Sequence, residues 1–209
     1  MKGMFMRTSS VFILGLLGLA ACGDDGASDP NASQEVITTV TLTLTPMGGG
    51  SPIVAEVDDP DGDGGDPPTI DSLGLPAGAT YGVTVGFQNR LELPAEEITD
   101  EVRDEAIDHQ IFFTGSAVTG PASGSSNAAI TQAYADTDAN GLPIGLSNTF
   151  TVASAPGGDL IVTLRHMPPI NDHPVKTADA AALVKASGFS SIGGENDAQV
   201  TFPVAIAVP

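Results

Sequence analysis

Residues 36–45 of this 209-residue chain read VITTVTLTLT, and this stretch decides the class of the fold. Its even-numbered positions alternate with odd-numbered positions that are mostly threonine, so successive side chains divide between two faces with a period of two. Most of these residues are β-branched, which favours an extended backbone. Pro46 and the glycines at 48–50 end the run. The stretch therefore predicts a long β-strand followed by a turn.

Six later stretches repeat this short alternating pattern, and turn residues separate them. They cover residues 53–57, 81–88, 129–135, 146–154, 160–166 and 200–206. Residues 75–85 also resemble the tyrosine corner of fibronectin type III domains, in which the hydroxyl of a residue such as Tyr81 bonds to the chain upstream. We therefore predict an all-β fold, an antiparallel β-sandwich of the immunoglobulin or fibronectin III type.

Two stretches interrupt the predicted strands. Residues 94–108 place apolar residues four apart behind a proline, with acidic residues in the first turns, which predicts a short acidic helix. Residues 167–196 are expected to form one long loop, in which the alanine-rich stretch 177–186 predicts a further helical turn. We expect both to be insertions in a single β domain.

The first 22 residues are built like a secretory signal that ends in a lipidation motif. Lys2 and Arg7 precede an apolar run at 11–19 that is too short to span a bilayer, and residues 19–22 read LAAC. Cys22 is the only cysteine of the chain, so no disulfide can form within it. We expect Cys22 to carry a lipid such as palmitate.

This signal predicts both the order of the segments and the location of the protein. Residues 1–21 are expected to be the signal peptide, residues 22–34 a flexible acidic tether, and residues 35–209 a single β domain. The lipid would hold the domain at the cell envelope, facing the periplasm or the cell surface, with the outer membrane favoured.

The part that follows the signal peptide is strongly acidic. It carries five basic against 26 acidic side chains, a formal charge of −21. Such a surface repels phosphate backbones and anionic lipid headgroups. We therefore exclude nucleic acid as a partner and assign membrane attachment to the lipid, with cations as the natural small ligands.

An acidic turn at residues 59–66 has the spacing of a calcium loop, in which oxygens at alternate positions converge on one ion. The expected ligands are Asp59, Asp61, Asp63 and Asp66. The twelfth position is Ile70 rather than the bidentate glutamate of a helix–loop–helix site, so an irregular calcium loop and a simple hairpin turn both remain open. For the similar stretch 136–141 we expect a turn.

Two histidines suggest a different metal site. Glu101, Glu105 and His109 follow one another at four-residue spacings, which would place them on one face of the acidic helix if the helix extends that far. His166 lies on the core-facing side of its predicted strand. Together, His109 and His166 could bind zinc or copper. The alternative is that both are half-buried and bonded to the backbone.

No catalytic motif stands out. The chain lacks the G-x-S-x-G motif of serine hydrolases, and its one cysteine is assigned to the lipid. We therefore expect a binding or structural module of the envelope, with no catalytic activity and no required cofactor. The alternatives are a metal-binding lipoprotein that uses calcium, zinc or copper, and a hydrolase whose site the order of the sequence conceals.

The chain also resembles a group of small bacterial lipoproteins of unassigned function. The similarity extends over most of residues 35–206 and rests on the segments 35–40, 59–65, 108–113, 136–141, 164–166 and 197–204. The resemblance implies a lipid-anchored domain outside the cytoplasm, and it implies no particular activity.

The lipid anchor predicts the behaviour of a Cys22→Ser variant. Cells fed labelled palmitate should label the wild-type protein but not the variant, because serine lacks the thiol that accepts the lipid. The variant should also leave the membrane fraction. Palmitate labelling that persists in Cys22→Ser would contradict the assignment.

Overall fold

The computed structural model describes residues 35–62 and 64–207, which form a mainly β structure with two sheets. The expected signal peptide, Cys22 and the tether lie outside the described residues, and so does Asp63. Within the described ranges, no helix is both long and apolar enough to cross a bilayer.

The larger sheet is built around β5 (Thr80–Asn89), whose residues alternate between buried and more exposed positions as the sequence predicts. β5 pairs antiparallel with β1 (Thr39–Pro46) on one side and with β10 (Ser147–Val152) on the other. The remaining strands of this sheet extend it at both edges. They are β2 (Ile53–Asp58) and β3 (Thr69–Ile70) beyond β1, β9 (Ile130–Tyr134) and β8 (Val118–Thr119) beyond β10, and β6 (Glu96–Glu97) beside β5.

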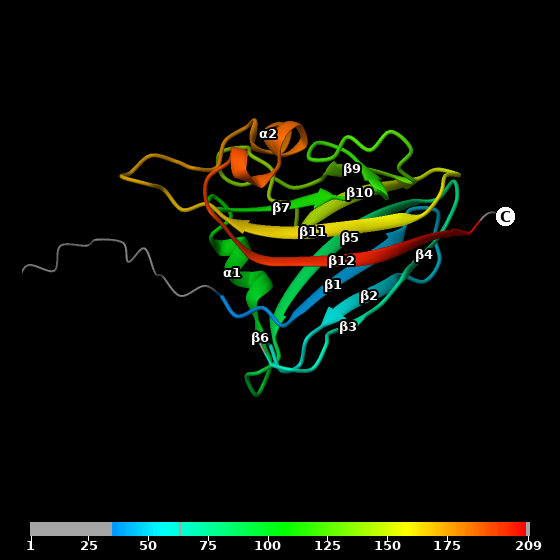
Figure 1. The fold of residues 1–209 in the computed structure, drawn as a ribbon, viewed down its shortest axis with the longest axis horizontal. Coiled ribbons are helices and arrows are strands. Elements are labelled where there is room, and N and C mark those ends of the chain that lie inside the picture. The colour runs from blue at the N-terminus through cyan, green and yellow to red at the C-terminus, as the bar shows by residue number, and fades with distance from the viewer. Residues whose placement is uncertain (1–34, 63, 208–209) are drawn as a thin grey trace, which may run out of the picture. The chain divides into compact units, whose positions relative to one another are not determined.

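The smaller sheet has four strands. Their order is β4 (Leu73–Pro76), β12 (Glu195–Ala207), β11 (Gly158–His166) and β7 (His109–Thr114). β11 pairs antiparallel with β12 and β7, whereas β12 and β4 run parallel. In Figure 1 the strands β1, β2 and β5 run obliquely to β11 and β12.

The main core contains buried residues from both sheets, so it lies between them. Phe113 of β7 and Phe150 of β10 meet edge to face, with ring centroids 5.5 Å apart, and this contact joins the smaller sheet to the larger. Leu42 and Leu44 of β1 are fully buried in the same core, which is why the alternating stretch at 36–45 decides the fold.

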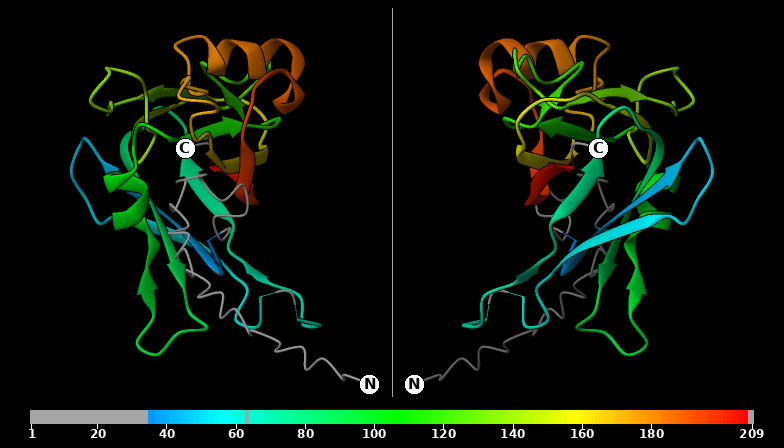
Figure 2. Two further views of the ribbon diagram at one scale, coloured as in Figure 1. Left: turned by 90° about the vertical axis from the view of Figure 1, so that its left-hand side faces the viewer. Right: turned by 90° about the vertical axis from the view of Figure 1, so that its right-hand side faces the viewer.

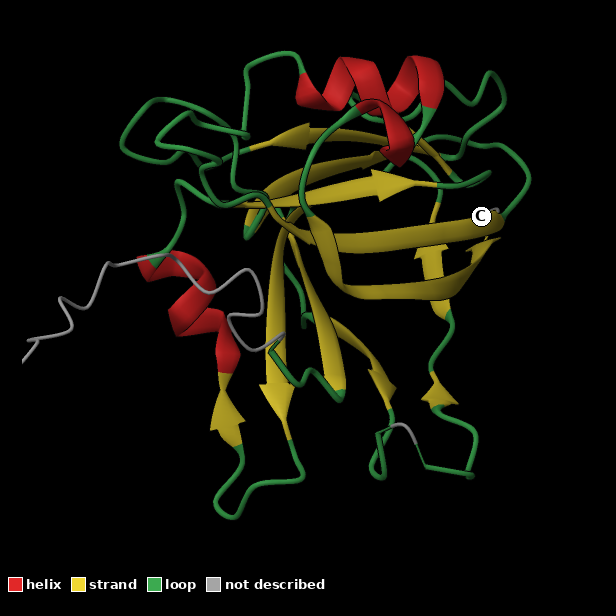
Figure 3. Ribbon diagram, turned by 60° about the vertical axis from the view of Figure 1, so that its left-hand side comes forward, coloured by secondary structure: helices red, strands yellow, loops and turns green. Residues whose placement is uncertain are grey.

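The helical segments cover the margins of the sheets (Figure 3). α1 (Ile98–Asp104) buries Ile98 and Val102 in the main core. α2 (Ala180–Ser187) and the 3₁₀ turn η1 (Phe189–Ser191) lie over a second, smaller core that includes Phe112 of β7. Figure 2 places α2 at one end and the loops after β2 and β5 at the other.

The predicted all-β fold is confirmed, and each of the seven predicted strands corresponds to a strand of the structure. The strand predicted at 36–45 begins only at Thr39, and the one predicted at 200–206 begins earlier, at Glu195. Two parts of the prediction are wrong. The sheets are mixed rather than purely antiparallel, because β4–β12 and β8–β9 pair in parallel. Tyr81 is buried at the start of β5, but its hydroxyl makes no hydrogen bond to the described residues upstream, so the defining contact of a tyrosine corner is missing.

The inserted elements match their predicted positions. The acidic helix is present but shorter than residues 94–108, because α1 ends at Asp104. The helical turn expected at 177–186 is α2. β7 was not predicted, because both of its faces are buried, one in the main core and one in the second core under α2, so it has no alternating pattern.

Truncation of a core leucine tests this account of the fold. Leu42→Ala should lower the free energy of unfolding by about 2–5 kcal/mol, because it leaves a cavity at a fully buried position. Leu93→Ala is the matched control at a side chain that is 93% exposed, and it should change stability by less than about 0.5 kcal/mol. Urea denaturation measures both, and equal effects of the two substitutions would contradict the assigned core.

Candidate functional site

A β-bulge near the start of β12 buries an acidic side chain. Ala198 lies opposite Leu164 and Asn196 lies opposite Arg165, so Asp197 is the extra residue with no partner on β11. The Asp197 side chain is 4% exposed. Strict alternation along β12 would instead have placed it on the outward face of the strand.

The backbone that leads into the bulge is fixed by Arg165. The Arg165 guanidinium donates hydrogen bonds to the carbonyl oxygens of Gly193 and Gly194, at 2.8 and 2.6 Å, and to Oδ1 of Asn196 at 2.7 Å. Gly194 has a φ of 83°, and a Cβ there would lie 2.1 Å from the carbonyl oxygen of His166. Only glycine fits this approach of β12 to β11.

His109 and His166 lie side by side at the ends of their strands. His109 begins β7 and His166 ends β11, and the register places them directly opposite each other. Their rings are stacked, with centroids 4.5 Å apart and planes inclined by 10°. The structure thus brings together the two histidines for which the sequence predicts a shared metal site. They meet as cross-strand neighbours, because α1 ends before His109 and the predicted helical face of Glu101, Glu105 and His109 does not form.

The hydrogen bonds of His109 decide the role of each ring nitrogen. Nδ1 lies 3.2 Å from the backbone carbonyl oxygen of Glu105. A carbonyl can only accept, so Nδ1 carries a proton. Nε2 lies 3.5 Å from Oδ2 of Asp197, within ion-pair distance. Nε2 of His109 and Oδ2 of Asp197 are both buried, and neither makes a hydrogen bond within the described residues.

Glu35 supplies a third group to this cluster. Its Oε2 is also buried without a hydrogen bond to the described residues. Glu35, His109 and Asp197 each offer a ligand atom, and these atoms lie within 4.8 Å of one another. A second set within the same distance consists of Glu105, His109 and His166. His109 therefore belongs to both sets, and we call Glu35, His109 and Asp197 the His109 cluster.

Two groups of the cluster, Glu35 and His109, hold protons more tightly than they would in water. Burial lowers the pKa of His109, but Asp197, the Glu105 carbonyl and Glu35 outweigh burial, and the pKa is raised overall. Burial raises the pKa of Glu35 to about 7; His109 opposes this shift, and the neighbouring carboxylate of Asp197 adds to it. Positive charge is thus favoured at this position.

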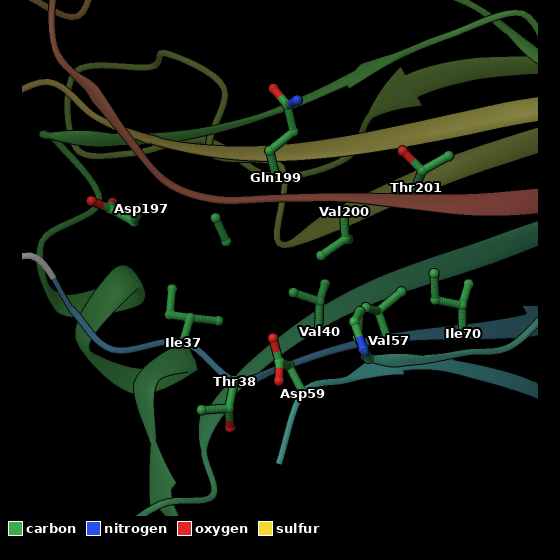
Figure 4. A pocket seen from close by; sticks show the side chains of 12 residues that line it. Ile37, Thr38, Val40, Val57, Asp59, Ile70, Asp197, Gln199, Val200 and Thr201 are labelled. Atoms are coloured by element: carbon green, nitrogen blue, oxygen red, sulfur yellow. The ribbon is translucent and has the colours of Figure 1, made fainter. Parts of the chain in front are cut away.

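A cleft of about 410 Å³ opens beside the cluster, between β12 and the strands β1 and β2. Figure 4 shows Asp197 at one end of it, with Val200 pointing toward Val40 and with Gln199 pointing away. A second hollow of about 470 Å³ adjoins it and is lined by Glu35 as well as Asp197. Asp197 and Glu35 therefore line hollows of the surface, while the cluster atoms that face His109 stay buried.

The acidic turn at 59–66 makes hydrogen bonds of its own. Oδ2 of Asp61 accepts from the backbone N–H of Asp66 at 3.2 Å, and Asp66 itself is exposed. The neighbouring Asp58 pairs with Arg90 at 3.0 Å. Among the described residues, the carboxylates of this turn, Asp59 included, do not form a set of three within 4.8 Å. A calcium ion at Asp59, Asp61, Asp63 and Asp66 stays a prediction.

The second acidic stretch is the turn that the sequence predicts. Asp136 accepts hydrogen bonds from the backbone N–H groups of Gly145 and Ser147, each at 2.8 Å. Asp138 accepts from the N–H groups of Asn140 and Leu142. Both carboxylates are therefore used to hold the connection between β9 and β10.

Sequence reasoning missed Asp197 and Glu35. The alternation of β12 assigns Asp197 to the solvent face, and only the bulge reverses this. The two glycines at 193–194 are the local signal for such an irregularity at the start of a strand. Glu35 precedes the first strand and reaches His109 only through the tertiary fold, for which the sequence offers no signal.

The raised pKa of Glu35 predicts a loss of stability with rising pH. Between pH 4.5 and about 7, the folded protein keeps a proton on Glu35 that the unfolded chain has released. Because the folded state binds more protons, its free energy of unfolding falls through this window. The stabilisation from protonated His109 is lost in the same direction, as pH rises through its raised pKa.

Glu35→Gln isolates this effect in chelator-treated protein. Relative to the variant, the wild type should lose stability from pH 4.5 to about 7, as measured by urea denaturation at each pH. Glu92→Gln, at an exposed glutamate, is the control and should follow the wild type. Parallel pH profiles for the wild type and Glu35→Gln would contradict the burial of Glu35 in the cluster.

Comparison with known proteins adds no further evidence on this site. No protein-family model, no curated protein and no solved structure matches the chain.

Proposed function

We propose that this protein binds a divalent transition-metal ion through Glu35, His109 and Asp197, as a lipid-anchored module of the cell envelope. One observation carries the proposal. The buried Nε2 of His109 faces Oδ2 of Asp197 at 3.5 Å without a hydrogen bond between them.

This arrangement requires a positive charge. The proton on Nδ1 is held by the Glu105 carbonyl, so a neutral His109 would direct its Nε2 lone pair at the Asp197 carboxylate. Two such groups repel each other in a buried site. Either a proton on Nε2 or a metal ion between the two atoms removes the repulsion. A buried His109 with its other nitrogen bonded to a carbonyl has the usual surroundings of a metal-binding histidine.

The donor set and its spacing suit zinc. One imidazole nitrogen and two carboxylate oxygens are ligands that Zn²⁺ accepts, and three protein ligands leave a position open. Neighbouring ligand atoms of a tetrahedral zinc site lie about 3.3 Å apart. The 3.5 Å between Nε2 of His109 and Oδ2 of Asp197 is close to this value. The open position would be reached through the cleft beside Asp197.

The pair of His109 and His166 is a weaker alternative. A metal ion lies near the plane of each imidazole that binds it, and two nearly parallel stacked rings have planes that meet only far from both. His166 would have to rotate before it could bind the ion held by His109. We therefore assign His166 to packing against His109.

The remaining parts of the proposal rest on the sequence. Cys22 is the proposed lipid site, and a calcium ion at the 59–66 turn is a separate candidate. We propose binding without catalysis. We further propose that the two sheets, with one core between them, are a β-sandwich of immunoglobulin or fibronectin III type modified by its two parallel strand pairs.

Calorimetric titration of the chelator-treated protein with Zn²⁺ tests the proposal. The wild type should bind one ion, and His109→Ala and Asp197→Asn should each weaken binding by more than about tenfold. His173→Ala changes an exposed histidine outside the cluster and should bind as the wild type does. His166→Ala should bind with a smaller loss than His109→Ala.

Three results would overturn the proposal or redirect it. Wild-type protein that binds no stoichiometric Zn²⁺ contradicts the site. Equal losses in His109→Ala and His166→Ala would favour the histidine pair instead. A melting temperature raised by Ca²⁺ and insensitive to Zn²⁺, with the effect lost in an Asp61→Ala and Asp63→Ala double variant, would move the site to the acidic turn.

A further inference from the structure

A buried lysine and a buried aspartate, neither of which belongs to the His109 cluster, form an ion pair. Nζ of Lys176 lies 2.8 Å from Oδ2 of Asp138. Their side chains are 1% and 0% exposed. Lys176 belongs to the connection between β11 and α2, and Asp138 to the connection between β9 and β10. The contact joins two segments that are 38 residues apart.

We infer that Lys176 and Asp138 are the site of a self-formed isopeptide bond, in which Nζ of Lys176 becomes joined to Cγ of Asp138. The inference is independent of metal binding. It rests on the hydrogen bonds of the two side chains, which place donors and acceptors where the formation of an amide requires them.

Two backbone N–H groups stand where negative charge would develop. Oδ1 of Asp138 accepts from the N–H of Asn140 at 2.8 Å and from the N–H of Leu142 at 2.9 Å. When an amine adds to a carboxyl carbon, one oxygen takes up negative charge, and a pair of fixed donors stabilises it as an oxyanion hole does. Oδ1 is therefore the oxygen that stays, and Oδ2, which faces the amine, is the one that leaves.

The reaction needs no second reactant. One proton passes from Nζ to Oδ2 along their hydrogen bond, which converts the ion pair into an amine and a carboxylic acid. The lone pair of Nζ then forms a bond to Cγ. A second proton moves from the nitrogen to Oδ2, the Cγ–Oδ2 bond breaks, and one water molecule leaves. Burial lowers the pKa of Lys176 in spite of the carboxylates around it, which favours this transfer. Burial also acts to raise the pKa of Asp138, but the hydrogen bonds from Lys176, Leu142 and Asn140 outweigh it and lower that pKa, so the transfer is the unfavourable step of the reaction.

The product fits the contacts that are already present. The amide N–H would donate to the carbonyl oxygen of Ala106, which now accepts from Nζ at 2.7 Å. The amide oxygen would keep the N–H groups of Asn140 and Leu142. Each polar atom of the buried amide thus has a partner. Since the chain has one cysteine, this bond would supply the internal cross-link that a disulfide cannot.

Tryptic peptide mapping of the full-length protein tests the inference, after prolonged incubation at neutral pH and denaturation. In the wild type, trypsin should fail to cleave after the acylated Lys176. The peptide 166–185 should then be found joined to the peptide 104–165, with a combined mass one water molecule below their sum. Lys176→Arg should abolish the joined species, because a guanidinium is not a nucleophile here.

Lys185→Arg is the matched control. It makes the same substitution at an exposed lysine, whose Nζ donates only to the Gly120 carbonyl oxygen among the described residues, and it should keep the joined peptides. Recovery of 104–165 and 166–176 from the wild type as separate linear peptides, with no joined species, would overturn the inference. The contact would then be a buried ion pair and nothing more.

Discussion

The candidate site depends on one extra residue in one strand. The bulge opposite Leu164 and Arg165 turns Asp197 from the solvent face of β12 toward His109, and without it the two side chains would lie on opposite sides of the sheet. Arg165 fixes the approach by donating hydrogen bonds to Gly193, Gly194 and Asn196 of the segment that enters β12. The strand pairing that forms the smaller sheet thus also places a carboxylate against a histidine in a buried position.

This arrangement gives a physical reason for cation binding in so acidic a protein. Exposed carboxylates are screened by water and salt, so a formal charge of −19 does not by itself define a site. The His109 cluster differs because its groups are buried and the proton on Nδ1 is fixed by the Glu105 carbonyl. A cation between Nε2 and Asp197 removes the repulsion that burial strengthens, whether that cation is a proton or a metal ion.

The sequence predicts those parts of the fold that have one buried face. The strand at 36–45 was predicted because its alternate residues enter the core, whereas β7 was not, because α2 covers its second face. His109 and His166, the two histidines predicted to share a site, do stack against each other, but as cross-strand neighbours and not through the predicted helix. Asp197 could not be predicted, because a bulge reverses which residues of a strand face the core. The position of this bulge depends on how β12 pairs with β11. Glu35 joins the site through tertiary contacts alone.

The central claim is that Nε2 of His109 holds a cation, and nitrogen-15 NMR of the imidazole side chains tests it most directly. Spectra of the chelator-treated protein at neutral pH would be compared before and after one equivalent of Zn²⁺. The account predicts that Nδ1 of His109 keeps its proton in both states, that the Nε2 signal moves on metal addition, and that His173 is unchanged. A neutral His109 with its proton on Nε2, and with no response to Zn²⁺, would contradict the claim.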